Sequence, residues 1–478
     1  MSIASPELNP AETTTTDRKV YVETLGCQMN LNDSELMLGL LAKEGFSQTY
    51  LPAEADLIIV NTCQIRGNAE DKAYAQVSNF RHYKNKNPNV KIVMTGCVAQ
   101  QAKDSATERS PYIDIVVGTQ NIKDLPELVN KAFEKTLTTP KKPKTAFAVD
   151  RQKTYNTYEY IDQYMDEVAP VRQSSVTAWI TIIEGCDYFC TYCVVPYTRG
   201  RQISRAPESI IKEARKVAEA GYKEVTLLGQ TVDAYGKDFE NRSYKLAELL
   251  RDLHEQVPEI QRWRFMTSHP LDLDDSIIDA IAELPRVMEY IHIPMQAGNN
   301  TVLERMRRGY SREQYFELID KIRTKIPDCA ITGDFIVGFP GETEEQFLET
   351  VDAVKRAQFD MAITAVYSPR KQTPAGIWVE RGDEQLLSEA EGKQRLQTLN
   401  LAIEEVGLQK NLLLVDTVQE ILIEGKSNRK KFDRWRGRTR TNKLVNIDVP
   451  NSEIDYLGQI VNVKITEASG FSLQGVLA

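Results

Sequence analysis

The chain has 478 residues, of which 41% are hydrophobic, 27% charged and 8% aromatic. This is the composition of a folded protein of several domains, and it excludes collagen-like, coiled-coil and low-complexity proteins. The formal charge is −9, from 59 Lys and Arg against 68 Asp and Glu, which argues against a protein that coats polyanions with its whole surface. Seven cysteines, an odd number in a long chain, argue against a disulfide framework and leave metal binding, catalysis or burial.

The beginning of the chain is small, polar and acidic, and we expect residues 1–18 to form a disordered tail. This tail has no apolar run flanked by positive charge. No later stretch approaches the roughly 18 to 20 apolar residues of a membrane span. We therefore expect a cytoplasmic protein without a membrane contact. We also expect it to act as a monomer.

Residues 19–136 alternate strand-like and helix-like segments, the pattern of an open parallel α/β sheet. The strand-like segments are 20–24, 57–61, 91–95 and 113–117, and the helix-like segments are 33–43, 67–83 and 124–134. Residues 137–174 are rich in Pro and Lys and then polar without periodicity. This stretch predicts a linker.

Residues 175–411 contain six further strand-like segments, each followed by a helical pattern. They are 176–183, 224–228, 263–267, 290–294, 330–337 and 361–367. Their spacing of roughly 30 to 45 residues is typical of right-handed βα crossovers, and six units fit an incomplete barrel better than a closed eight-unit one. A hydrophobic helix-like segment at 386–408 closes this domain.

Residues 412–478 change to short alternating strands at 418–424, 443–447, 459–465 and 471–476, which predict a small β-barrel. The expected fold class is therefore α/β, with an N-terminal open parallel sheet, a central incomplete (βα)6 barrel and a small C-terminal β-barrel.

Cys186, Cys190 and Cys193 form a CxxxCxxC sequence at the end of the first barrel strand. Three thiolates on one short loop are ligands that iron selects, and three rather than four leave one coordination position open. The position also fits, because sites in βα-barrels form at the carboxyl ends of strands. Structural zinc and three cysteines of the core remain the alternatives.

Cys27, Cys63 and Cys97 each follow a predicted parallel strand of the first domain. The carboxyl ends of neighbouring parallel strands meet at one edge, so these three side chains are expected to converge. From topology alone, a second three-thiolate site and three buried or redox cysteines both stay open. Cys329 stands in an apolar strand start and predicts a core thiol.

The CxxxCxYC sequence, with Tyr192 as its aromatic residue, resembles the radical SAM superfamily. Two three-cysteine sites and a small C-terminal β-domain resemble the methylthiotransferases over nearly the whole chain, from about residue 19 to 478. The motifs that carry this resemblance are TLGCQMNLNDSE (24–35), NTCQIRGNAEDKAY (61–74), IIEGCDYFCTYCVVPYTRGRQISR (182–205), HIPMQAGNNTVLERMRRGY (292–310) and GDFIVGFPGETEEQF (333–347).

Within that family, Gln28-Met29-Asn30 and the CVVPYTRGR run are similar to the enzymes that act on N6-isopentenyladenosine at position 37 of tRNA. The chain departs from that group at Thr231 and Asp233, where asparagines are usual, and at Ala297, where Ser is usual. These departures bear on the substrate contacts rather than on the family.

The resemblance implies a [4Fe-4S] cluster and S-adenosylmethionine at Cys186, Cys190 and Cys193, and a second, auxiliary [4Fe-4S] cluster on Cys27, Cys63 and Cys97, so that all six cysteines are catalytic. It implies that one S-adenosylmethionine methylates a sulfur on the auxiliary cluster. A second is cleaved to a radical that removes hydrogen from C2 of the adenine, and methylthio transfer gives 2-methylthio-N6-isopentenyladenosine. An electron donor such as flavodoxin or ferredoxin is implied, and the sulfur source stays open.

Three alternatives remain for the function. One is the same chemistry on threonylcarbamoyladenosine in tRNA, and another is its application to a ribosomal-protein aspartate. The third belongs to a different class: a non-catalytic RNA-binding protein stabilised by zinc.

The predicted contacts to S-adenosylmethionine are polar groups at barrel strand ends. They are Gln230, Ser268, Gln296 and Asp334, the backbone that begins at Gly338, and the ring of Tyr192. Their alternative roles are to cap the following helices or, for Tyr192, to anchor the loop.

The stretch 425–443, GKSNRKKFDRWRGRTRTNK, contains nine Lys or Arg and one Asp, a charge of +8 in an acidic chain. Basic residues with interleaved aromatics are what phosphate contact and base stacking need, and the stretch resembles the TRAM domain of tRNA-modifying enzymes. The predicted RNA-binding residues are Lys430, Lys431, Arg434, Trp435, Arg436, Arg438 and Arg440. A solvated basic loop is the alternative.

Overall fold

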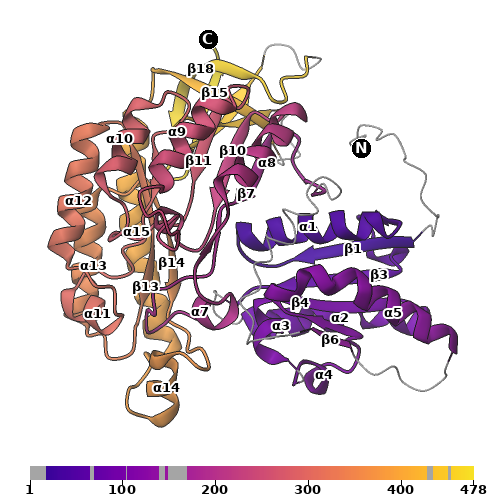
Figure 1. Ribbon diagram of the computed structural model, residues 1–478. Helices are drawn as coiled ribbons and strands as arrows, with labels where there is room; N and C mark the ends of the chain where they lie inside the picture. The colour runs from indigo at the N-terminus through magenta and orange to yellow at the C-terminus, as the bar shows by residue number, and fades with distance from the viewer. Residues whose placement is uncertain are drawn as a thin grey trace. The chain divides into compact units, whose positions relative to one another are not determined.

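The computed structural model describes residues 18–64, 69–103, 105–138, 146–148, 170–427, 434–449 and 454–478. They form two compact units, divided between Val171 and Arg172 (Figure 1). None of the helices in these ranges combines the length and the apolarity that crossing a membrane requires.

The first unit is built on a six-stranded sheet in the order β2-β1-β3-β4-β5-β6, and all of its strand pairs are parallel. The strands are β1 (Arg18–Thr24), β2 (Phe46–Gln48), β3 (Leu57–Thr62), β4 (Lys91–Gly96), β5 (Ile115–Val117) and β6 (Ala146–Ala148). The helices are α1 (Gln28–Lys43), α2 (Ala69–Lys86), α3 (Cys97–Ala102), α4 (Ser105–Arg109) and α5 (Leu125–Thr138), with short 3-10 turns η1 (Pro52–Glu54) and η2 (Thr119–Asp124).

Alternate residues of β3 face two different hydrophobic clusters. Leu57 and Ile59 pack in one cluster with residues of α1 and α5, and Ile58 and Val60 pack in the other with residues of α2. Because helices cover both faces, the strand is apolar at consecutive positions, as parallel sheets require. The predicted open parallel α/β domain is confirmed.

The edges of this domain differ from the sequence prediction. Arg18, predicted in the tail, belongs to β1, because it pairs in register with Phe46 and its guanidinium lies 4.3 Å from the centre of the Phe133 ring. The predicted linker contributes β6, which pairs with β5 at the sheet edge. Residues 1–17 and most of the linker lie outside the described residues.

The second unit begins with a sheet of six parallel strands in two halves, β11-β10-β7 and β12-β13-β14. They are β7 (Thr177–Thr181), β10 (Glu224–Leu228), β11 (Arg262–Phe265), β12 (Tyr290–His292), β13 (Ala330–Val337) and β14 (Met361–Val366). The halves are joined where the Trp263 N–H donates to the Arg286 carbonyl at 2.7 Å. No described pairing joins β14 to β7, so the barrel is incomplete, as predicted.

The second unit also contains the helices that connect or follow its strands. They are α7 (Val195–Thr198), α8 (Pro207–Glu219), α9 (Leu246–Gln256), α10 (Asp275–Glu283), α11 (Asn300–Arg305), α12 (Arg312–Lys325), α13 (Glu344–Ala357), α14 (Pro374–Arg381) and α15 (Glu389–Leu412). Two smaller elements follow the first strands along the chain. The strands β8 (Ile183–Glu184) and β9 (Ile203–Ser204) pair after β7, and the turn η3 (Val232–Ala234) comes after β10. One hydrophobic cluster runs through strands and helices, with Val225, Leu227 and Phe265 in its centre.

The C-terminal segment is a closed barrel in the order β15-β16-β17-β19-β18. Its strands are β15 (Val418–Lys426), β16 (Trp435–Thr439), β17 (Leu444–Asp448), β18 (Ile460–Ala468) and β19 (Ser472–Leu477). The prediction of a small β-barrel is confirmed, with five strands in place of four. The additional strand is β16, in which Trp435, Gly437 and Thr439 are buried and the arginines between them lie outward.

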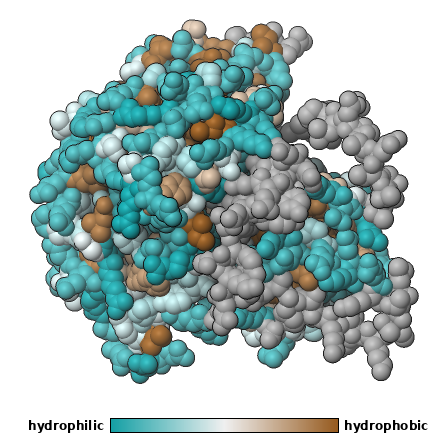
Figure 2. Space-filling view, viewed as in Figure 1, coloured by the Kyte–Doolittle hydropathy of each residue, from teal (hydrophilic) through white to brown (hydrophobic). Residues whose placement is uncertain are grey.

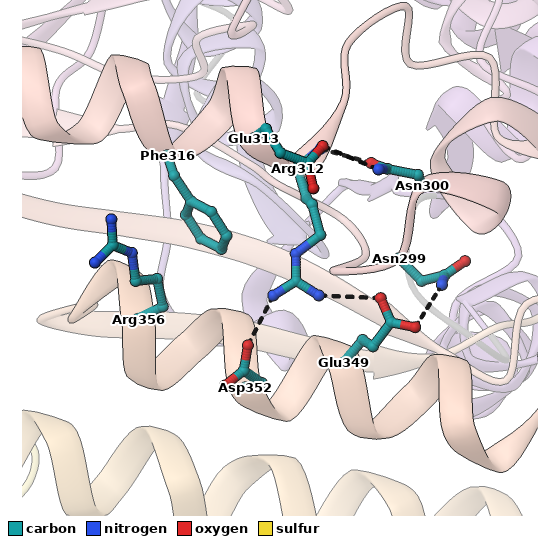
Figure 3. Close-up of a pocket in the computed structure, with 8 residues that line it drawn as sticks. All are labelled: Asn299, Asn300, Arg312, Glu313, Phe316, Glu349, Asp352 and Arg356. Carbon is teal, nitrogen blue, oxygen red and sulfur yellow. Dashed lines mark hydrogen bonds and ion pairs between the residues drawn. The ribbon is translucent and has the colours of Figure 1, made fainter.

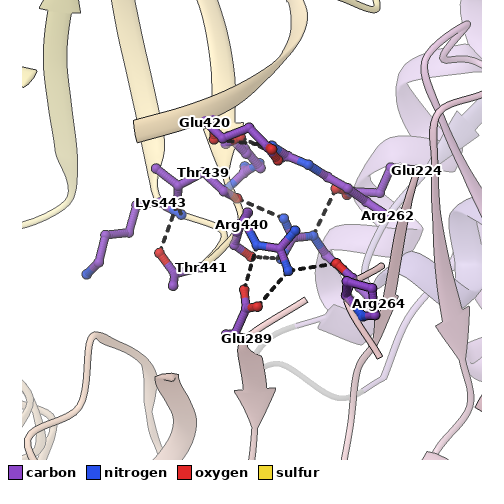
Figure 4. A network of polar contacts seen from close by, with 11 residues as sticks. Glu224, Arg262, Arg264, Glu289, Glu420, Thr439, Arg440, Thr441 and Lys443 are labelled. Carbon is purple, nitrogen blue, oxygen red and sulfur yellow. Dashed lines mark hydrogen bonds and ion pairs between the residues drawn. The ribbon is translucent and has the colours of Figure 1, made fainter. Parts of the chain in front are cut away.

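The C-terminal barrel docks on the amino-terminal ends of the central strands (Figure 4). Arg262 and Arg264 of β11 are buried, and they donate hydrogen bonds to the carbonyls of Arg438 at 2.8 Å and Thr439 at 2.8 Å. Arg264 also pairs with Glu224, the first residue of β10, at 3.0 Å. Figure 1 shows β15 and β18 at one end of the central strands and α7 at the other.

Two further ion pairs complete this junction. Arg440 pairs with Glu289, which immediately precedes β12, and Lys443 pairs with Asp360, which immediately precedes β14. The carboxyl ends of the strands stay clear of these contacts. On the face shown in Figure 2, hydrophobic residues form isolated patches on a hydrophilic surface.

Candidate active site and nucleic-acid interface

The loop of Cys186, Cys190 and Cys193 follows β8 at the carboxyl end of the first barrel strand. Its first turn needs a glycine, because Gly185 has φ +77° and a Cβ there would lie 2.1 Å from the Arg201 carbonyl oxygen. The Gly185 N–H donates to Gln230 Oε1 at 2.5 Å, and the Cys186 N–H donates to the Gly200 carbonyl at 3.1 Å. Gln230, predicted to contact S-adenosylmethionine, therefore supports the loop.

The other end of the loop is tied to the turn after α11. The Thr191 N–H donates to the Met306 carbonyl at 3.1 Å, and the Thr191 hydroxyl donates to the Arg305 carbonyl at 2.8 Å. Arg308 lies 3.4 Å from both Cys190 Sγ and the Tyr192 hydroxyl. Arg308 was not predicted from the sequence, because a basic residue in MRRGY is typical of a protein surface. Its one signal in the sequence is its place in the motif 292–310, two residues before Tyr310.

The surroundings of the loop oppose ionisation of the thiols. Burial, followed by the neighbouring Cys190, raises the pKa of Cys193 to about 12. Burial also raises the pKa of Cys186, although the hydrogen bond with Thr231 Oγ1 at 3.2 Å lowers it in part. Thiols lose their protons and become thiolates when they coordinate a metal cation.

Among the described residues, no three His, Cys, Asp or Glu side chains are arranged to hold one metal ion. A cluster of several irons accepts thiolates that are spread further apart, as around a loop of this length. The donor set therefore fits an iron-sulfur cluster with one open position, held by Cys186, Cys190 and Cys193.

Several buried polar atoms that lack a described hydrogen-bond partner lie just after β11 and within β13. Ser268 Oγ, His269 Nε2 and Asp334 Oδ1 are three of them. Nearby, Thr267 and Gln296 have φ angles of +77° and +75°, which are strained for residues other than glycine. Unsatisfied polar atoms and local strain are typical of a ligand site, and this one fits the polar amino-acid end of S-adenosylmethionine.

The predicted strand-end residues thus separate into two groups. Ser268 and Asp334 present unsatisfied atoms, and Gln296 lies on the strained backbone between them. The Gly338 N–H is already taken by Glu342 Oε2 at 2.6 Å, and Gln230 by the cysteine loop. Of these predicted contacts, only Ser268 and Asp334 have a buried polar side-chain atom without a described hydrogen-bond partner.

A second group of polar and ionisable residues lies beside the loop. The Tyr188 hydroxyl donates to Asp272 Oδ1 at 2.7 Å, and its ring stacks on His269 with centres 3.8 Å apart. Burial, followed by the charge of Asp272, raises the pKa of Asp233 well above its ordinary value. Burial, followed by the charge of Arg308, lowers the pKa of His269 to about 2.

In the first unit, Cys27, Cys63 and Cys97 follow the carboxyl ends of three adjacent strands, β1, β3 and β4. Cys63 and Cys97 come directly after the register pair formed by Thr62 and Gly96. A Cβ on Gly26 would lie 2.8 Å from Cys63 Sγ, so the Cys27 turn and Cys63 are in close contact. The predicted convergence of these strand ends is thereby seen in the backbone.

The asparagines of this edge hold the turn in place. Asn30 Nδ2 donates to the Thr62 carbonyl at 3.0 Å, and Cys27 Sγ donates to Asn30 Oδ1 at 3.7 Å. Asn61 Nδ2 donates to the Asn30 carbonyl at 2.8 Å. The buried polar residues of α1 therefore serve the cysteine edge, and they explain why this helix begins at Gln28 rather than near residue 33.

A polar pocket of about 540 Å³ lies between α11, α12 and α13, outside the barrel (Figure 3). Arg312 in this pocket pairs with Glu349 at 3.0 Å and with Asp352 at 2.7 Å, and Arg356 pairs with Asp320 outside it at 3.2 Å. None of its lining residues belongs to the predicted sites. This pocket is therefore not the catalytic site.

The predicted RNA-binding residues have different environments. Lys430 and Lys431 lie outside the described residues. Trp435 is 5% exposed and packs edge-on against Tyr456 inside the C-terminal barrel, so its predicted base-stacking role is wrong for this conformation. It was misjudged because the strand that buries it was not recognised.

The four predicted arginines lie on or beside β16. Arg440 pairs with Glu289 in the junction, and Arg434 pairs with Asp448 at 2.5 Å. Arg438 donates to the Asn442 carbonyl at 3.0 Å. Arg436 has no described hydrogen-bond or ion-pair partner and lies on the outward face of the strand.

Comparison with known proteins agrees with this division. Residues 19–118 match the model of "Uncharacterized protein family UPF0004", residues 180–354 that of the "Radical SAM superfamily" and residues 413–478 that of the "TRAM domain". A solved structure of TsrM from Kitasatospora setae, a radical S-adenosylmethionine methyltransferase with cobalamin and a [4Fe-4S] cluster bound, is similar with a TM-score of 0.54. It is 17% identical and covers 77% of this chain and 75% of its own, a likeness of fold.

Curated relatives match over almost the full length. A tRNA-2-methylthio-N(6)-dimethylallyladenosine synthase of Bacillus mycoides is 42% identical over 96% of this chain and 86% of its own. The protein of the same name from Carboxydothermus hydrogenoformans is 41% identical over 96% of this chain and 99% of its own. The chain belongs to this family of radical SAM enzymes, the tRNA-2-methylthio-N(6)-dimethylallyladenosine synthases.

Proposed function

We propose that this enzyme converts N6-isopentenyladenosine at position 37 of tRNA to 2-methylthio-N6-isopentenyladenosine. The observation that carries the proposal is the match of about 41% identity over 96% of the chain to enzymes named for this product. S-adenosylmethionine on a [4Fe-4S] cluster supplies the radical that activates an unreactive C–H bond. Cys186, Cys190 and Cys193 would hold that cluster, and Ser268 and Asp334 offer polar atoms to the amino-acid end of S-adenosylmethionine.

Mass spectrometry of tRNA nucleosides tests this function. A strain that lacks the gene should accumulate N6-isopentenyladenosine and lose its 2-methylthio derivative, and complementation should restore it. Loss of only the methylthio derivative of threonylcarbamoyladenosine would show that threonylcarbamoyladenosine is the substrate instead. If neither tRNA nucleoside changes, the ribosomal-protein aspartate becomes the substrate to test.

The proposal includes a second [4Fe-4S] cluster on Cys27, Cys63 and Cys97. It is supported by the shared position of these residues after three adjacent strands and by the close approach of Gly26 to Cys63. Replacing all three with Ala should reduce the iron of the anaerobically reconstituted enzyme from about eight to about four per chain. Cys329→Ala is the control, since Cys329 is buried beside β13; equal iron in both variants would contradict the second cluster.

We also assign tRNA contact to the C-terminal barrel, with Arg436 on its outward face. Arg436→Gln should weaken tRNA binding and reduce its salt dependence by about one phosphate contact. Arg440→Gln is a matched control of equal charge change, because Arg440 is occupied by Glu289. An equal loss of affinity in both variants would indicate a general charge effect. A one-electron donor such as flavodoxin or ferredoxin completes the proposed system.

A further inference from the structure

Arg308 closes one side of the cysteine loop and is 5% exposed. Its Nε donates to the Tyr310 hydroxyl at 2.9 Å, and its Nη2 donates to the Pro294 carbonyl at 3.0 Å. Its Nη1 donates toward Cys190 Sγ and the Tyr192 hydroxyl, both at 3.4 Å. Two nitrogens therefore anchor the guanidinium, and the third is directed at the cysteine loop.

The backbone fixes this arrangement as well. The Arg308 N–H donates to the Leu303 carbonyl at 3.0 Å at the end of α11. The same turn accepts the hydrogen bonds of Thr191 through the carbonyls of Arg305 and Met306. Main-chain contacts on both sides thus fix the turn that carries Arg308 relative to the cysteine loop.

The charge of Arg308 is unusual among the buried arginines of the described chain. The others all pair with a carboxylate: Arg199 with Glu184, Arg205 with Glu213, Arg262 with Glu420, Arg264 with Glu224, and Arg395 with Glu342. Among the described residues, no carboxylate pairs with Arg308. A buried cation is costly without an anion, so its surroundings should supply one.

The groups that contact Arg308 identify that anion. They are the Pro294 carbonyl, two tyrosine hydroxyls and the thiol of Cys190. The carbonyl carries no charge, and both tyrosine hydroxyls are phenols. A thiol is intrinsically more acidic than a phenol, and iron binds it as the thiolate. Cys190 is therefore the counter-ion for which the guanidinium is placed.

We propose that Arg308 is a positioning residue that donates a hydrogen bond to the Cys190 thiolate and raises the reduction potential of the iron-sulfur cluster on this loop. Hydrogen bonds to ligand sulfurs and nearby positive charge favour the reduced, more negative cluster. The inference rests on the proposed function only in that the loop binds a cluster. It adds a residue that makes the one-electron reduction of that cluster easier.

The test is an EPR-monitored redox titration of the anaerobically reconstituted enzyme in four variants. Arg308→Met and Arg308→Gln remove the cation, and Arg308→Lys keeps it. Arg307→Met is the matched control, because Arg307 is the adjacent exposed arginine and loses the same charge. Iron content and far-UV circular dichroism are recorded for each variant.

At a fixed potential, Arg308→Met and Arg308→Gln should lower the ratio of reduced to oxidised cluster at least tenfold, a shift of about 59 mV for one electron. Arg308→Lys should recover most of this loss, and Arg307→Met should match the parent. If Arg308→Met does not fold, the comparison of the Gln and Lys variants decides the question.

Equal potentials in the Gln and Lys variants and in Arg307→Met, at full iron content, would overturn the role of Arg308 while leaving the cluster in place. A parent enzyme that binds no iron at this loop would instead refute the proposed function. The two failures are therefore distinguishable.

Discussion

Asp360 forms the ion pair whose loss should most weaken the contact between the C-terminal barrel and the central strands. Its carboxylate pairs with Lys443 of the turn before β17 and with Lys410 of α15, and it accepts a hydrogen bond from the Ile331 N–H at 2.9 Å. The side chain of Asp360 is 5% exposed, that of Lys443 13% and that of Lys410 22%. Asp360→Asn would keep an acceptor for Ile331 and remove only the charge.

Removing one member of a buried ion pair costs about 3–5 kcal/mol. Because both lysines retain some contact with water, we expect the lower end, about 3 kcal/mol. Burial alone would raise the pKa of Asp360, but Lys443 and Lys410 outweigh it and hold this pKa below its ordinary value of 3.8. The stabilisation is therefore present above pH 3.8 and is lost as the pH falls through the lower folded-state pKa.

Hydrogen exchange measured by mass spectrometry reports the opening of this junction locally, which suits a chain of several domains. In Asp360→Asn, amides of β17 and β14 should exchange about a hundredfold faster, the equivalent of about 3 kcal/mol. Asp279→Asn is the control, because Asp279 forms an exposed pair with Lys325 and its loss should leave these strands unchanged. A less than tenfold change in β17 of Asp360→Asn would refute the reasoning.

Two further predictions concern the sites. Burial, followed by the charge of Asp272, raises the pKa of Asp233 in the folded protein above its ordinary value of 3.8. As the pH rises above 3.8, the carboxyl of Asp233 ionises in the unfolded chain while it stays protonated in the folded one, and the free energy of unfolding therefore declines. Asp233→Asn should therefore raise the melting temperature more at pH 7 than at pH 5 by calorimetry, and an equal gain at both would contradict the burial of a protonated carboxyl. Gly26→Ala should remove about half of the bound iron, because its Cβ would lie 2.3 Å from Cys63 Cβ. Gly221→Ala has a similar positive φ of +90° but no atom within 4 Å, and it should retain its iron; equal iron in the two variants would disprove the steric argument.

The common edge of the cysteines and the incomplete barrel could both be predicted from the sequence, because they depend on where strands end and on the chemistry of thiols. Cys63 and Cys97 could be placed on one edge because apolar strands precede them and parallel strands share their carboxyl edge. The incomplete barrel followed from six strand-like segments at regular spacing. In both cases the local pattern and the tertiary structure agree, which is why the prediction succeeded.

The sequence could not predict what depends on pairing between distant segments. Trp435 lies in a run of arginines that looks like a solvated loop, and only the partner strands show that alternate residues turn inward. Arg308 was missed for the same reason, since its partners Cys190 and Pro294 are remote in the chain. In a sequence, charged residues are usually assigned to the protein surface. In this fold several charged side chains are instead buried in contacts that hold the structure together.

The C-terminal barrel and the cysteine loop occupy opposite ends of the same strands. The longest of these strands, β13, has eight residues, and eight residues of strand extend about 26 Å. A molecule that touches both ends at once must be at least this long, the length of about eight stacked base pairs. A free nucleoside cannot span that interval, whereas a folded stem with its loop can. The ion pairs at Glu289 and Asp360 hold the C-terminal barrel at one end of the central strands, so the length of these strands sets the shortest substrate that can contact both ends.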